Sequence, residues 1–156
     1  MSTNSYLFLA AICVCSCLTA CKVGSEMPDI SSMPEFANLY GNEYFFKKGI
    51  GVHWVNLDRD NKGPAHYLYV TIGSNFDDPY TIKKMEYMPG GKFEVIGVRL
   101  CTLCFPDEKM YEIKLQGLDT EVPIFLADNR GEFKTSIEND GVVTFNSEVI
   151  GIIPRE

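Results

Sequence analysis

Short apolar segments separated by turn residues fill the chain from residue 50 to its end, and this pattern limits the fold more than any other feature. Such a series is typical of antiparallel sandwiches and barrels. No segment longer than a few residues has a convincing helical period. The sequence therefore predicts an all-β chain, a small antiparallel β-sandwich. The expected strands lie at residues 50–57, 66–72, 80–88, 92–100, 110–115, 121–127, 132–136, 142–147 and 149–153.

Three of these segments also indicate their place in the sheet. Residues 66–72 are apolar or aromatic on both faces, which predicts a central strand. Pro89-Gly90-Gly91 separates residues 80–88 from residues 92–100, and glycine tolerates the positive φ of a tight turn. We expect these two strands to form a hairpin.

The part before residue 50 has a different composition. Residues 21–33 are rich in serine and other polar residues, which indicates a tether. A short helix could start at Pro34, where the missing amide does no harm. Phe36 and Tyr40 predict that this part packs on the domain. The expected organisation is a signal peptide at 1–20, a tether with a short helix at 21–49 and the sandwich domain at 50–156.

An uncharged apolar run from Tyr6 to Leu18 precedes Leu18-Thr19-Ala20-Cys21. The run has the length of a signal-peptide core and is shorter than the ~20 residues of a membrane-spanning helix. Leu18-Thr19-Ala20-Cys21 resembles the lipobox of bacterial lipoproteins. The resemblance implies cleavage before Cys21, a diacylglycerol on its sulfur and an acyl chain such as palmitate on the new amino end.

The same resemblance implies where the protein lies. It implies a protein of the bacterial cell envelope that is attached to the membrane by the lipid on Cys21. Lys22 follows the modified cysteine, and this resembles enterobacterial-type lipoproteins sorted to the outer membrane. We therefore expect the protein on the periplasmic face of the outer membrane.

The net charge of the chain indicates which class of partner it can bind. The net charge is −7, and residues 101–156 hold 5 basic and 11 acidic residues. This balance disfavours nucleic acid, which binds through neutralisation of its phosphates by lysine and arginine. It favours a basic protein partner, although ordinary surface solubility explains the charge as well. The candidate contacts for such a partner are Asp107, Glu108, Asp119 and Glu121.

Cys101-Thr102-Leu103-Cys104 is the remaining thiol pair. A structural disulfide between Cys101 and Cys104 is the preferred interpretation, because exported domains meet oxidising conditions. A zinc half-site with His53 and His66, or a redox pair, remains open. We expect neither a metal nor a cofactor.

No known catalytic motif accompanies the two histidines. His53 and His66 each stand alone in the sequence, whereas a general base needs a nucleophile and an orienting group beside it. We expect both at strand ends or on the surface. No catalytic residue is predicted, and we expect the chain not to be an enzyme.

These observations favour a lipid-anchored periplasmic module that binds another protein. Two roles fit: an immunity lipoprotein that neutralises a toxin, similar in size, signal and acidity to those of type VI secretion, or a structural lipoprotein of an envelope or secretion assembly. The competing hypothesis is a small-ligand or enzymatic domain that uses His53, His66 or the Cys101 and Cys104 pair. Convergence of these side chains in one pocket would favour chemistry, and their dispersal would favour a partner.

Overall fold

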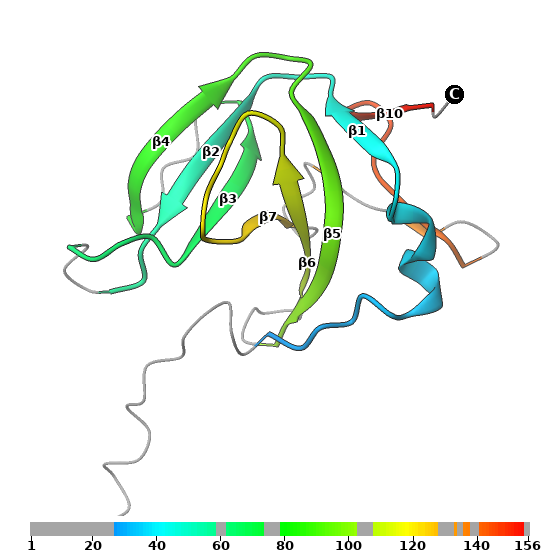
Figure 1. The fold of residues 1–156 in the computed structure, drawn as a ribbon, viewed down its shortest axis with the longest axis horizontal. Helices are drawn as coiled ribbons and strands as arrows, with labels where there is room; N and C mark the ends of the chain where they lie inside the picture. The colour runs from blue at the N-terminus through cyan, green and yellow to red at the C-terminus, as the bar shows by residue number, and fades with distance from the viewer. Residues whose placement is uncertain are drawn as a thin grey trace, which may run out of the picture.

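One eight-stranded sheet forms the frame of this protein, as the computed structural model shows (Figure 1). The structure describes residues 27–58, 62–73, 79–102, 108–127, 133, 136–137 and 141–154. The elements are the 3₁₀-helix η1 (Pro34–Leu39) and the strands β1 (Glu43–Phe46), β2 (Ile50–Val55), β3 (Tyr67–Ile72), β4 (Thr81–Tyr87), β5 (Lys92–Cys101), β6 (Glu108–Leu115), β7 (Ile124–Ala127), β8 (Ser136–Ile137), β9 (Val143–Thr144) and β10 (Ile150–Ile153).

The strand order is β10-β1-β5-β6-β7-β3-β2-β4, and β8 pairs with β9 in a separate two-stranded sheet. Neighbours run antiparallel except β3 and β7, which are parallel. The prediction of an all-β, sandwich-like fold is confirmed. Of the residues predicted as strands at 132–136 and 142–147, Ser136 belongs to β8 and Val143 and Thr144 form β9.

The hydrophobic core lies within the curve of the large sheet. One buried cluster joins Val52 of β2 and Leu68 of β3 to Ile150 of β10, although β2 and β10 lie near opposite ends of the strand order. The sheet must therefore bend around this cluster, and Figure 1 shows β5 curving along its length. The burial of these side chains supplies most of the driving force for the fold.

Aromatic rings fasten β1 to its neighbour β5. Phe93 stacks on Phe46 with ring centroids 4.5 Å apart and on Tyr44 at 5.4 Å. Phe145 meets Tyr44 edge-on at 5.3 Å. All three residues of the stack are at most 2% exposed, so β1 is an integral strand of the core.

The segment before β2 corrects the predicted domain boundary at residue 50. Phe36 and Leu39 of η1 are buried, which confirms that this part packs on the domain. Pro34 takes the first position of the helix, as predicted. β1 then lies between β10 and β5, so folded structure includes much of the segment 21–49 that the sequence assigns to a tether. Its alternating aromatic residues provide the physical reason, because each second one enters the core.

The turn at Pro89-Gly90-Gly91 does not produce the predicted hairpin. β4 pairs with β2, whereas β5 pairs with β1 and β6. The tight turn itself is present, with Gly90 at a φ of 96°. Its backbone bonds go to β1 instead: the Gly90 amide donates to the Phe46 carbonyl at 2.7 Å, and the Phe46 amide donates to the Gly91 carbonyl at 2.9 Å. The hairpin prediction is therefore wrong, and the central position predicted for β3 is confirmed.

Candidate functional site

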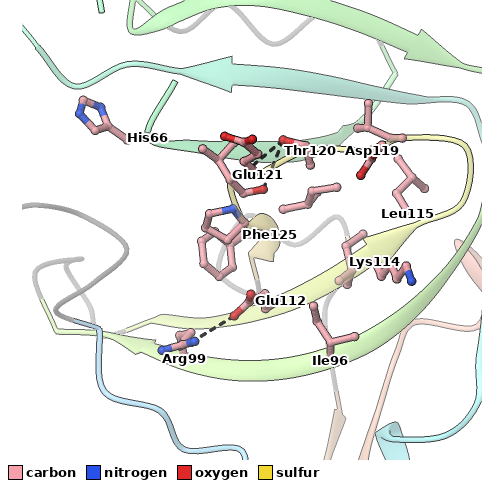
Figure 2. Close-up of a pocket in the computed structure, with 15 residues that line it drawn as sticks. His66, Ile96, Arg99, Glu112, Lys114, Leu115, Asp119, Thr120, Glu121 and Phe125 are labelled. Carbon is pink, nitrogen blue, oxygen red and sulfur yellow. Dashed lines mark hydrogen bonds and ion pairs between the residues drawn. The ribbon is translucent and has the colours of Figure 1, made fainter. Parts of the chain in front are cut away.

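A cavity of about 680 Å³ lies beside the loop that connects β6 to β7 (Figure 2). One wall comes from β5 and β6, and the facing wall comes from the loop. The residues that line it include His66, Ile96, Arg99, Glu112, Lys114, Leu118, Asp119, Thr120, Glu121, Val122 and Phe125.

The alternation of β6 directs two charged side chains into this cavity. Tyr111, Ile113 and Leu115 face the core cluster. The residues between them point to the other face of the sheet, because successive side chains of a strand alternate. Glu112 is half-buried there and Lys114 is exposed, and both line the cavity.

The loop of residues 116–123 is held in place at both ends. The Gln116 amide donates to the Lys92 carbonyl at 2.8 Å, and Gly117 provides the left-handed turn with a φ of 82°. Leu118 and Val122 pack against the core cluster. The residues between these two anchors are thereby held over the cavity.

An ion pair fixes the wall opposite the loop. Arg99 Nε lies 3.2 Å from Glu112 Oε2. Gly97 faces this carboxylate, and a Cβ at Gly97 would lie 3.3 Å from the same oxygen, so the glycine leaves room for the pair. The backbone of Asp29, in the segment before η1, forms an isolated antiparallel β-bridge with the backbone of Arg99. Hydrogen bonds from the side chain and backbone of Ser31 hold the pKa of Asp29 below its ordinary value.

The charges that remain at the mouth are mainly acidic. Arg99 neutralises Glu112. The other charged side chains of the lining are then one basic residue, Lys114, and two exposed carboxylates, Asp119 and Glu121. Figure 2 shows Asp119, Thr120 and Glu121 on one side and the Arg99–Glu112 pair on the other, with Phe125 labelled between them. The cavity thus combines apolar surface with two carboxylates at its rim.

Four acidic residues are predicted as partner contacts, and the structure separates them. Asp119 and Glu121 lie together on the loop and are exposed. Glu108 is 7% exposed at the start of β6, so the prediction of a surface contact there is wrong. Glu108 shares a face of β6 with Met110, and Met110 belongs to a second buried cluster together with Cys101, the residue that pairs with Glu108. Asp107 lies outside the described residues.

The two histidines occupy different environments. His53 is completely buried in the middle of β2, with Nε2 3.0 Å from Thr71 Oγ1, so the prediction of a strand-end or surface position is wrong. His66 is half-buried and lines the cavity, and its Nδ1 accepts a hydrogen bond from the Leu57 amide at 3.1 Å. This bond places the proton of the neutral ring on Nε2.

Cys101 is the last residue of β5 and is 9% exposed. Cys104 and Cys21 lie outside the described residues, so the pairing with Cys104 and the lipidation of Cys21 stay predictions. His53, His66 and Cys101 do not converge: of the three, His66 alone lines the cavity.

Sequence reasoning does not identify Arg99 and Glu112 as parts of one site. Within the described ranges, no group of three His, Cys, Asp or Glu side chains could hold a metal ion. No helix in the same ranges is long and apolar enough to cross a bilayer.

Comparisons with known proteins give no relative. No family model, curated protein or solved structure matches the chain.

Proposed function

We propose that this protein is a lipid-anchored component of the bacterial cell envelope that binds a partner protein by receiving a basic side chain in the cavity beside β6. The observation that carries this proposal is the pair of exposed carboxylates, Asp119 and Glu121, at the rim of a partly apolar cavity.

The chemistry of the cavity suits arginine or lysine. The stem of either side chain can cover apolar surface such as that of Ile96 and Val122, while the charged head stays at the polar rim. Charge-assisted hydrogen bonds to Asp119 and Glu121 would then fix the head group. A basic side chain is also the choice that the acidic balance of residues 101–156 favours.

The lipobox-like Leu18-Thr19-Ala20-Cys21 supports the location of this function. Confinement to a membrane raises the effective concentration of a binding module near a membrane-associated target.

Within this class, we propose toxin neutralisation by an immunity lipoprotein as the leading role, with a structural part in an envelope assembly as its rival. An immunity protein binds a soluble toxin tightly, whereas an assembly component binds a resident envelope protein. The identity of the captured partner therefore separates the two.

Capture of partners from envelope and periplasmic extracts by the immobilised full chain tests the proposal. We expect a protein that the native chain retains and that Glu121→Lys retains at least tenfold less. Glu148→Lys makes the same change of charge at an exposed position outside the cavity lining and should retain the partner fully. Equal retention by Glu121→Lys, or no specific partner at any ionic strength, would overturn the proposal.

A further inference from the structure

β4 forms one edge of the large sheet and is unusually exposed. Among the strands that the structure describes, β2 is its one pairing partner. The five residues from Ile82 to Glu86 are all exposed, and Ile82 and Met85 are apolar. Met88, just beyond the strand, is 82% exposed. An edge of this kind offers backbone and apolar side chains to another strand.

We propose that β4 pairs antiparallel with β4 of a second copy, so that two sheets join into one continuous sheet. A two-fold axis perpendicular to the sheet relates such strands, and each residue then faces a residue of the same side of the sheet. One residue must therefore lie opposite its own copy. Near the middle of β4 the candidates are Lys84, Met85 and Glu86.

Charge selects among these three registers. With Lys84 at the axis, two ammonium groups would lie opposite each other, and with Glu86 at the axis, two carboxylates would do so. Like charges directly opposite each other destabilise a strand pair. With Met85 at the axis, Lys84 of each copy lies opposite Glu86 of the other, which gives two favourable pairs.

The same register also matches the apolar side chains. It brings Met85 opposite itself, within the stretch from Lys83 to Tyr87 that pairs regularly with β2; the register with β2 shifts at Ile82. On the side of the sheet that faces the core, Lys83 lies opposite Tyr87, whose ring can receive the ammonium group. Lys83 already lies 4.5 Å from the centre of the Trp54 ring within its own chain. β4 is therefore complementary to itself in one register.

The paired edge is separate from the cavity. No described residue of β4 lines the cavity, so pairing through β4 leaves both cavities of a dimer open. The dimer does not depend on the proposed binding of a basic side chain. Glu121→Lys should remove partner capture and leave the dimer unchanged, which distinguishes the failure of one idea from the failure of the other.

Cysteine cross-linking of the full chain tests the register. Residues directly opposite each other have Cα atoms about 4.5–5.5 Å apart, within the range of a disulfide. Met85→Cys should give a covalent dimer on oxidation. Lys84→Cys, which lies opposite Glu86 instead of itself, should give no more dimer than the native chain with its own cysteines. Absence of the Met85→Cys dimer, or an equal yield from Lys84→Cys, would overturn the register.

Charge exchange tests the pairing without new cysteines. Lys84→Glu and Glu86→Lys each create two like-charge pairs, and each should raise the dissociation constant of the dimer about tenfold or more, as measured by sedimentation of the full chain in detergent. An equimolar mixture of the two variants restores opposite charges and should form mixed dimers of native strength. Lys114→Glu, on β6, is the control that keeps the native dimer. A monomeric native chain, or a mixture no stronger than its components, would overturn the proposal.

Discussion

Replacement of Gly51 by alanine tests how tightly the buried face of β2 is packed. An ideal Cβ at Gly51 would lie 2.9 Å from His53 Nε2, 3.0 Å from the Gly73 carbonyl oxygen and 3.1 Å from Thr71 Oγ1. These atoms belong to one hydrogen-bonded group. Thr71 Oγ1 donates to the Gly73 carbonyl at 3.3 Å, so His53 Nε2 donates to Thr71 at 3.0 Å. A methyl group at Gly51 would force this group apart.

The magnitude follows from three contributions. Overpacking of a buried site costs about 1–3 kcal/mol. Weakening of the hydrogen bond between His53 and Thr71 adds about 1 kcal/mol. Alanine regains about 0.5–1 kcal/mol because glycine loses more conformational entropy in a strand. We therefore expect Gly51→Ala to lower the free energy of unfolding by about 1–3.5 kcal/mol.

Urea unfolding followed by the fluorescence of Trp54, the single tryptophan, measures this change. Gly91→Ala is the matched control, because the nearest atom to its ideal Cβ lies at 3.8 Å and its φ is not in the left-handed region. The control should be neutral or gain about 0.4–1 kcal/mol through a stiffer unfolded chain. A Gly51→Ala variant as stable as the native protein would refute the packing argument.

Two further substitutions test the core and the anchor. Tyr44→Phe removes the hydroxyl that donates to the Leu39 carbonyl at 3.2 Å and should cost about 1 kcal/mol at neutral pH. Burial raises the pKa of Tyr44 above its ordinary 10.0, so the native protein should lose stability as the pH rises through 10, and Tyr44→Phe should lose less over that range in thermal unfolding. Cys21→Ser should abolish metabolic labelling with palmitate and move the protein out of the membrane fraction; labelling that persists would contradict the lipid anchor.

Local patterns in the sequence predict the strands well because they are set by neighbouring residues. Alternation and turn residues place β2 to β7 within a few residues of their observed bounds. β1 is missed because its Glu-Tyr-Phe-Phe is only four residues long. Its ring stack with Phe93, almost fifty residues away, supplies the stability that the local pattern does not show.

The order of the strands could not be predicted from local patterns, because it depends on contacts between segments that are distant in the sequence. The sequence correctly predicts the tight turn before β5, but β4 pairs with β2 while β5 pairs with β1 and β6. The candidate site depends on this order: Glu112 meets Arg99 because β5 and β6 are adjacent, and their separation in the sequence does not indicate it. The acidic residues Asp119 and Glu121 could be predicted as surface residues because they lie in a polar connection, whereas the buried position of Glu108 could not.

The proposed anchor and the proposed dimer reinforce each other. Strand pairing at one edge supplies modest free energy, because each cross-strand pair contributes only about 0.2–1 kcal/mol. Two chains tethered to the same bilayer meet at a higher effective concentration than free chains do. Dimers through β4 should therefore form more readily on the membrane than in solution. Cross-linking of Met85→Cys in cells should fall when Cys21→Ser is added, while the same double variant at high concentration in solution should still cross-link.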